Sequence, residues 1–368
     1  MEKMNIENET RPFITILLPC YNEEVILQQN INVVIDYLKS KNHKYSWEII
    51  IVDDGSKDKT GILADQFEKQ YASIRVIHHP TNLNLGNALK TGFRNAKGDI
   101  IVVMDIDLSY SIDHIEKMVD KLVETSSDIV IASPYMPGGK VTDVPFTRII
   151  MSRWVNRFMR IAAQDKYYTY TGMVRAYRKD FINTVNLKTK DYEINPEILY
   201  KAMILRARII EIPAHLDWTE QNKYKGKRNS SIRMLRGFFS GIMSSFIFRP
   251  YIFFLAIGTF LMLLSMYELV WLLFDTLSYM ARQPETEQPF SASLALQFRR
   301  NPQSFIVGGI TFIAAIQFLS LGFLSLQSKR YFEELFHLGT SLKKRNETNN
   351  FEENIKSKKT NYEDQKTK

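Results

Sequence analysis

Short apolar runs alternate with amphipathic stretches along the first part of the chain. Each run is followed by roughly 10 to 18 residues in which apolar positions recur at helical spacing. Runs without internal alternation are typical of strands that are buried on both faces. The pattern therefore predicts an α/β domain with a doubly wound, mostly parallel (Rossmann-like) sheet and right-handed crossovers. The predicted strands are residues 13–18, 47–52, 74–78, 100–104, 128–133 and 207–214.

Helical periodicity lies between these strands. The predicted helices are residues 23–40, 57–71, a helix opening at 84, 109–123, 145–163 and 191–205. The helix at 145–163 is basic and amphipathic, because Arg153, Arg157 and Arg160 share one face beside Trp154. Such a helix can lie in a membrane interface with its tryptophan at the level of the headgroups. The alternative is an ordinary solvated helix face.

Two much longer apolar runs follow, at 251–274 and 304–327. Because about 20 residues suffice to cross a hydrocarbon core of about 30 Å, both are predicted to be transmembrane helices. Gly308, Gly309 and Gly322 suit helix packing and could also join two copies of the chain as a homo-oligomer. The connection 275–303 is balanced in charge and both flanks are basic, which places the connection outside and both termini in the cytoplasm.

These patterns divide the chain into parts. A disordered lead-in at 1–12 precedes an α/β domain at 13–230 and an amphipathic juxtamembrane helix at 231–250. The two spans with their external connection occupy 251–327, and a charged cytoplasmic tail occupies 328–368. Residues 340–368 are rich in Asn and Lys and are expected to be disordered.

The net charge of +8 is concentrated beside the predicted spans. Between Lys223 and Arg249 there are several basic residues and no acidic one. Such a cluster next to a span attracts anionic lipid headgroups, and the adjoining spans argue against a nucleic-acid partner. The single cysteine, Cys20, excludes an internal disulfide and fits a reducing compartment.

Carboxylates recur at the C-terminal ends of the predicted strands. Asp105 and Asp107 follow the strand at 100–104, one residue apart, so both can face one hard cation such as Mg²⁺ or Mn²⁺. Tyr21, Glu23, Asp53 and Asp54 follow the first two strands, and these ends share one edge of a parallel sheet, where ligands of such sheets bind. The pattern indicates a metal–diphosphate site. Each motif alone could instead be a turn or a helix cap.

Glycine-rich phosphate loops are missing from the sequence. No Gly-x-Gly-x-x-Gly follows the first strand, and there is no Gly-x-x-x-x-Gly-Lys-Ser/Thr. The diphosphate of a bound nucleotide would then be held by the metal.

Four motifs in order resemble the GT-A glycosyltransferases of family 2, within the branch of dolichyl-phosphate mannosyltransferases and bactoprenol glucosyltransferases. The motifs are Pro19-x-Tyr21-Asn22-Glu23, Asp53-Asp54-Gly55-Ser56, Asn84-x-Gly86 with Ala88 and Gly92, and Asp105-x-Asp107-Leu108. The resemblance runs from about residue 12 to about residue 236. The two later apolar runs match the bacterial members, which implies a bacterial inner membrane.

The resemblance implies roles for individual residues. A GDP- or UDP-linked sugar is expected to bind at Pro19, Tyr21, Glu23, Asp53, Asp54, Lys90 and Asp105. The metal is expected to bind at Asp105 and Asp107. The residues expected to bind the acceptor phosphate are Arg148, Ser152, Arg153, Arg175, Arg228 and Ser230. The chain departs from the family at Ser109, where a glutamine metal ligand is common, and at Pro134, where an arginine is usual.

The sequence thus predicts a metal-dependent, inverting glycosyltransferase that moves a sugar from a nucleoside diphosphate to a polyprenyl phosphate at the cytosolic membrane face. Asp105, Asp107, Arg148 and Ser152 are its candidate catalytic residues. One alternative is the same fold acting on a lipid or glycan hydroxyl, with Asp191 or Glu197 as base. Another is a catalytically silent membrane scaffold that binds nucleotide.

Overall fold

The computed structural model describes residues 11–163, 167–224, 250–282 and 289–366. The chain forms two compact units, one of residues 1–248 with 336–368 and the other of residues 249–335. Several predicted features lie outside the described residues: most of the lead-in, the loop with Arg228 and Ser230, and the juxtamembrane helix up to its last residue.

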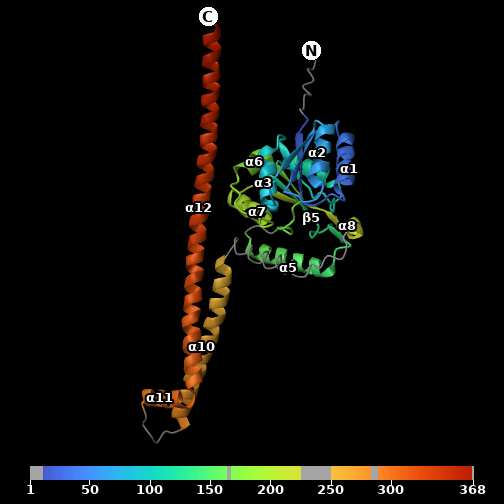
Figure 1. Ribbon diagram of the computed structural model, residues 1–368. Coiled ribbons are helices and arrows are strands. Elements are labelled where there is room, and N and C mark those ends of the chain that lie inside the picture. Colours follow the sequence, from blue (N-terminus) through green and yellow to red (C-terminus); the bar gives the residue numbers. More distant parts are fainter. Residues whose placement is uncertain (1–10, 164–166, 225–249, 283–288, 367–368) are drawn as a thin grey trace, which may run out of the picture. The chain divides into compact units, whose positions relative to one another are not determined.

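The first unit is built on a seven-stranded sheet with the strand order β3-β2-β1-β4-β7-β5-β8 (Figure 1). Its strands are β1 (Phe13–Cys20), β2 (Ser46–Asp53), β3 (Ile74–His78), β4 (Ile100–Val103), β5 (Ile129–Ser133), β7 (Arg175–Arg178) and β8 (Ile209–Pro213). A second sheet pairs β6 (Lys140–Thr142) with β9 (His215–Asp217). The predicted strands are therefore present, each within a few residues of its expected bounds.

One strand of the main sheet runs against the others. β7 pairs antiparallel with both β4 and β5, whereas the remaining pairs are parallel. This strand was not predicted, because a run of four residues with two arginines has no apolar signature. The sheet is mostly parallel, as the sequence predicts.

Helices cover both faces of the sheet. One face packs against α1 (Leu27–Ser40), α2 (Thr60–Gln70) and α4 (His114–Glu124); the other packs against α3 (Leu85–Asn95), α5 (Phe146–Ala162), α6 (Lys179–Thr184) and α7 (Ile194–Ile204) (Figure 1). Alternation along the strands separates the two cores: Ile16 and Val102 face the first, and Leu17 and Val103 face the second.

Two helices begin later than the sequence predicts, and both delays create loops at the same edge. α1 begins at Leu27 rather than near residue 23, and α4 begins at His114 rather than near 109. Ser109 N–H donates to Asp107 Oδ1 at 3.0 Å, and Tyr110 forms a β-bridge with Leu216. The residues after β4 are therefore tied into a loop instead of a first helical turn.

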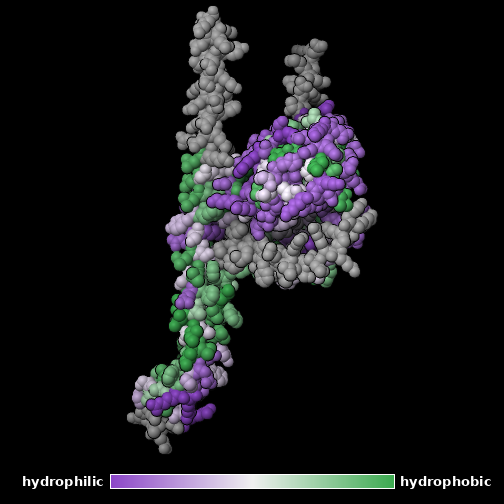
Figure 2. Space-filling model, viewed as in Figure 1, coloured by the Kyte–Doolittle hydropathy of each residue, from purple (hydrophilic) through white to green (hydrophobic). Residues whose placement is uncertain are grey.

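The second unit is helical, and it ends at Leu335, inside its last helix. α10 (Pro250–Arg282) and α12 (Pro302–Lys366) each contain a stretch long and apolar enough to cross a membrane, and α11 (Phe290–Arg300) lies between them in sequence. Figure 2 shows the apolar surface along α10 and the neighbouring part of α12. A Cβ at Gly322 would lie 2.7 Å from a Leu255 methyl, so this glycine allows close packing of the two helices.

Two predictions about the end of the chain can be compared with α12. The apolar run at 304–327 lies in this helix, as expected. Disorder at 340–368 was also expected, but the helix continues to Lys366. These residues contain no glycine or proline to end it.

Candidate functional site

The candidate site lies where the strand order of the sheet reverses. β1 has β2 on one side and β4 on the other, and the chain crosses between them after β3. In open α/β sheets the crevice at such a switch point, beyond the carboxyl ends of the strands, binds ligands. Cys20 pairs with Asp53 at this edge, and Met104 N–H donates to Leu17 O at 3.1 Å. Tyr21, Asp53 and Asp105 therefore follow three adjacent strands at one edge.

The loops after β1 and β2 are joined by hydrogen bonds. Asn22, in the left-handed region at φ 56°, donates its N–H to Ser56 Oγ at 3.0 Å and accepts from Lys57 N–H at 2.8 Å. Glu23 N–H donates to Thr60 Oγ1 at 2.7 Å. These bonds fix the backbone around Tyr21 and Glu23, while the Tyr21 side chain stays 40% exposed and available for stacking.

Two histidines at the end of β3 hold the aspartate pair. Asp53 Oδ2 lies 2.9 Å from His78 Nδ1, and Asp54 Oδ1 lies 2.6 Å from His79 Nδ1. Both aspartates are buried, and Asp54 also accepts from Leu83 N–H at 2.9 Å. The sequence analysis missed these histidines. Their position at the C-terminal end of a predicted strand was the available signal.

His78 makes the stability of the fold depend on pH. Burial lowers the pKa of His78, but hydrogen bonds to Asp53 and Asp65 outweigh it, so the pKa in the folded protein is raised above 6.5. A raised pKa stabilises the fold fully below the unfolded value of about 6.5, and the stabilisation is lost as pH rises through the folded pKa. We expect His78→Gln to destabilise the protein most below about pH 6.5, measured by urea unfolding from about pH 5.5 to 8.5. Parallel curves for the two proteins would contradict this.

Asp105 and Asp107 offer a donor set that fits a hard divalent cation. Both are partly exposed, at the edge where β4 ends. Among the described residues, no group of three or more His, Cys, Asp or Glu is arranged to hold a metal. Two carboxylates still fit Mg²⁺ or Mn²⁺, because Mg²⁺ commonly binds one or two protein carboxylates and completes its shell with water and substrate phosphates.

Three predicted acceptor residues lie on α5, close to aromatic rings. The Arg148 guanidinium lies 4.8 Å from the centre of a Trp218 ring, and that of Arg153 lies 5.9 Å from the Tyr135 ring. Burial raises the pKa of the Tyr135 phenol, although its hydrogen bond with Ser152 and the charge of Arg153 lower it. Pro134 replaces the arginine that is usual in the family, but the next residue, Tyr135, still places an aromatic ring beside Ser152.

Arg175 is a structural residue, contrary to its predicted role at the acceptor phosphate. Its side chain is fully buried within β7. Its guanidinium donates to Tyr170 O at 2.6 Å and to Asn195 O at 3.0 Å. Burial lowers the pKa of this arginine. The linear motif around residue 175 could not reveal the burial, because β7 itself was not predicted.

We expect Arg175→Met to lower the free energy of unfolding by about 2 to 5 kcal/mol, because two buried carbonyls lose their donor. The KM for the lipid acceptor should stay unchanged in the protein that remains folded. Urea unfolding and steady-state kinetics measure the two quantities. A higher KM at unchanged stability would restore the predicted acceptor role.

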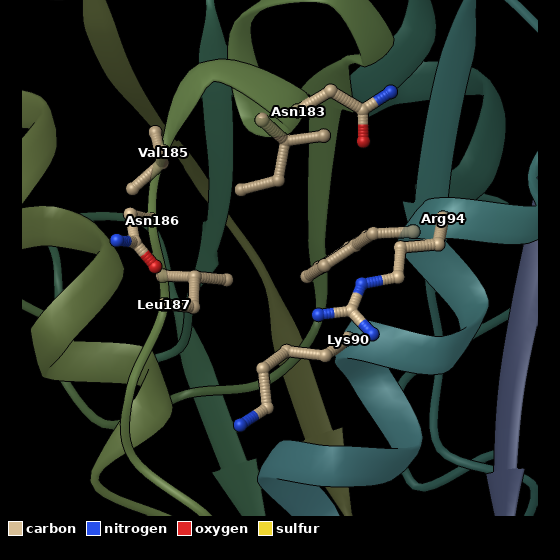
Figure 3. Close-up of a pocket in the computed structure, with 8 residues that line it drawn as sticks. Lys90, Arg94, Asn183, Val185, Asn186 and Leu187 are labelled. Carbon is tan, nitrogen blue, oxygen red and sulfur yellow. The ribbon is translucent and has the colours of Figure 1, made fainter. Parts of the chain in front are cut away.

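Lys90, a predicted nucleotide ligand, lies on α3 beside residues 182–187. It lines a cavity of about 260 Å³ together with Arg94, Asn186 and Leu187, and Figure 3 shows both cationic side chains extending along it. Burial and the charges of Arg94 and other cations lower the pKa of Lys90, which Glu197 opposes. Its role as a nucleotide ligand stays a prediction.

Comparison with known proteins identifies the part of the chain that carries these motifs. The sequence profile described as Glycosyl transferase family 2 matches residues 15–185, which include all of the motifs at this edge of the sheet. Residues 15–185, somewhat less than half of the chain, belong to a family 2 glycosyltransferase domain. The domain has the GT-A fold, as the sequence predicts.

Relatives of the glycosyltransferase domain include enzymes named for dolichyl phosphate. The chain is 30% identical to dolichol-phosphate mannosyltransferase of Pyrococcus furiosus over 61% of its own length and 62% of that enzyme, somewhat less than two thirds. It is 26% identical to dolichyl-phosphate beta-glucosyltransferase ALG5A of Trichomonas vaginalis, over 60% of this chain and 70% of that enzyme. It is 27% identical to glycosyltransferase AglD of Haloferax volcanii, over 58% of this chain and 34% of that protein.

Among solved structures, the chain is similar to glucosyl-3-phosphoglycerate synthase from Mycobacterium tuberculosis. The alignment has a TM-score of 0.46 and 18% identity, and it covers 64% of this chain and 78% of that one. The synthase was crystallised with Mn²⁺, uridine diphosphate and phosphoglyceric acid.

Proposed function

We propose that this protein transfers a sugar, with inversion, from a nucleoside diphosphate to a polyprenyl phosphate at the cytosolic face of a membrane. One observation carries the proposal: residues 218–221 contact both Asp107 and Arg148, because Gln221 donates to Asp107 Oδ2 and the Arg148 guanidinium lies 4.8 Å from the centre of the Trp218 ring. The carboxylates proposed for the cation of the donor diphosphate therefore lie near an arginine that can bind an acceptor phosphate. The names of two relatives, which specify dolichyl phosphate, support the same class of acceptor.

On the donor side, Tyr21, Glu23, Asp53 and Asp54 would bind the GDP or UDP part, with Pro19 in β1 beside them. Asp105 and Asp107 would hold Mg²⁺ or Mn²⁺. When bound, this ion stabilises the charge that develops on the leaving diphosphate. Hydrogen bonds with His78 and His79 would keep the buried carboxylates of Asp53 and Asp54 oriented before the donor arrives.

On the acceptor side, a phosphate needs little activation. It is largely ionised near neutral pH, with a second pKa of about 6 by analogy with phosphorylated side chains. Arg148, Ser152 and Arg153 would orient it for in-line attack. Arg228 and Ser230 stay predictions for the same phosphate, since they lie outside the described residues.

A hydroxyl acceptor is less well supported, because it would need a general base. The Glu197 carboxylate is held by Lys201 Nζ and by Thr189 Oγ1, both at 2.5 Å, and by two backbone N–H groups. Burial raises the pKa of Glu197, but these donors outweigh burial and lower it, which leaves the carboxylate a weak base. Asp191 already accepts from Tyr192 N–H at 2.9 Å.

Two features support a membrane location for the site. Phe146, Ile150, Trp154 and Phe158 recur every fourth residue along α5, and all four are exposed. An exposed apolar stripe on a basic helix is typical of helices that lie in a membrane interface. The apolar stretches of α10 and α12 are compatible with membrane insertion. Both termini would be cytoplasmic, in a bacterial inner membrane, and homo-oligomers through these helices stay a prediction.

The deciding experiment uses the full chain in membranes with undecaprenyl phosphate and a panel of radiolabelled GDP- and UDP-sugars. We expect one donor to give a labelled lipid only when Mg²⁺ or Mn²⁺ is added. Product analysis should show the inverted anomer. A product with free undecaprenol instead of its phosphate would favour a hydroxyl acceptor. Turnover with no donor would favour a silent nucleotide-binding scaffold.

A further inference from the structure

A short segment near the end of the glycosyltransferase domain connects the two halves of the proposed site. This bridging segment comprises residues 217–221: the end of β9, Trp218 and the start of α8 (Thr219–Tyr224). Asp217 N–H donates to Ser109 O at 2.8 Å, which ties the segment to the loop after β4. Trp218 N–H donates to Thr142 O at 3.1 Å, which ties it to β6, just before α5.

The bridging segment presents one side chain to each half. The Gln221 carboxamide is buried and donates to Asp107 Oδ2. The Trp218 ring lies under the Arg148 guanidinium. The start of α8 is itself braced, since Asp217 Oδ1 accepts from Thr219 N–H at 2.9 Å and Thr219 Oγ1 donates to Asp143 Oδ2 at 2.7 Å.

The contact with Asp107 bears on position 109, where this chain has serine and the family commonly has a glutamine. Ser109 has no carboxamide, and Gln221 supplies one to the loop after β4 from a distant part of the chain. Asp107 Oδ1 accepts from Ser109 N–H and Oδ2 from Gln221, so one bond on each oxygen fixes the plane of the carboxylate. A carboxylate has about four acceptor sites, which leaves each oxygen able to bind a cation as well.

We propose that Gln221 and Trp218 are positioning residues, Gln221 for the metal carboxylate Asp107 and Trp218 for the acceptor residue Arg148. The inference rests on the proposed function. Groups that orient a metal-binding carboxylate typically change metal affinity 10- to 100-fold when they are removed. A ring beneath a guanidinium fixes its position through a cation–π contact.

The first test measures Mn²⁺ binding by electron paramagnetic resonance, with the full chain in detergent and with GDP or UDP present. We expect Gln221→Ala to weaken Mn²⁺ binding about 10- to 100-fold. Gln70→Ala, an exposed glutamine at the end of α2, is the matched control and should leave it unchanged. Binding within twofold of wild type in Gln221→Ala would overturn the proposal. So would tighter binding in Gln221→Glu, which would make residue 221 a direct ligand.

The second test separates Trp218 from Gln221. We expect Trp218→Leu to raise the KM for the lipid acceptor about 3- to 30-fold at unchanged Mn²⁺ affinity. Trp218→Phe keeps an aromatic ring under Arg148, so its KM should return most of the way to the wild-type value. A loss of Mn²⁺ affinity in Trp218→Leu would indicate a merely structural segment and overturn the assignment. If no polyprenyl phosphate accepts sugar, the proposed function fails while the Mn²⁺ arm still decides the role of Gln221. Absence of Mn²⁺ binding in wild type would overturn the inference about Gln221.

Discussion

Asp107→Asn should abolish transfer, with turnover reduced about 10³-fold or more, while the protein stays folded and membrane-bound. The substitution keeps the size of the side chain but removes the charge that would hold the cation. A bound cation supplies several kcal/mol of stabilisation to the departing diphosphate, and each 1.36 kcal/mol is a factor of ten in rate. The asparagine oxygen can still accept from Ser109 N–H, and its NH2 can donate to Gln221 Oε1 once the Gln221 carboxamide turns over, so stability should change little. Labelled lipid product, Mn²⁺ affinity and circular dichroism measure the three effects.

Asp99→Asn is the matched control for this prediction. Asp99 is exposed and lies just before the opposite end of β4, so the same change of charge occurs beside the same strand but at the other edge of the sheet. Its turnover should stay within about twofold of wild type. Wild-type turnover in Asp107→Asn would remove the metal assignment, and an unfolded Asp107→Asn protein would show that the carboxylate acts through stability instead.

The edge of the sheet could be predicted because it follows from a general rule. Parallel strands bring their carboxyl ends together, so carboxylates at 53, 54, 105 and 107 had to share one edge once the strands were recognised. The rule needs only local apolar runs, which the sequence displays plainly. Local patterns could not predict that α1 and α4 begin later than expected. Their first turns are replaced by hydrogen bonds to loops far away in sequence, such as the bond from Glu23 N–H to Thr60 Oγ1.

Residues that depend on long-range packing could not be predicted. Arg175 resembles a phosphate ligand in its linear motif, but an antiparallel strand inserted between β4 and β5 buries it. Gln221 contacts Asp107 across more than one hundred residues, and neither position carries a local signal of the other. His79 is intermediate, because its position at a strand end was visible but its partner Asp54 was not. Sequence periodicity specifies elements and edges, whereas side-chain partners require the assembled fold.

Arg148→Met should lower kcat/KM for the polyprenyl phosphate about 10²- to 10³-fold at unchanged affinity for the nucleotide sugar. The methionine fills much of the space beside Trp218 but cannot donate to a phosphate, and a misplaced nucleophile alone can cost about 10²-fold. Arg148→Lys keeps the charge without the planar fork and should recover only part of the loss. Acceptor and donor titrations with membranes that contain each variant measure the two affinities.

Arg157→Met separates this role from general attraction between α5 and an anionic membrane. Arg157 is exposed and lies about 2.5 helical turns further along the same helix, so its loss removes the same charge at a distance from Arg148. Attraction of a surface arginine to anionic lipid is worth about 1 kcal/mol, which limits the expected effect on the KM for the lipid to about fivefold. Equal losses of kcat/KM for the lipid in the two variants would mean that Arg148 acts only as one of several surface cations. A much larger loss in Arg148→Met supports a specific contact with the attacking phosphate, next to the carboxylates that hold the donor.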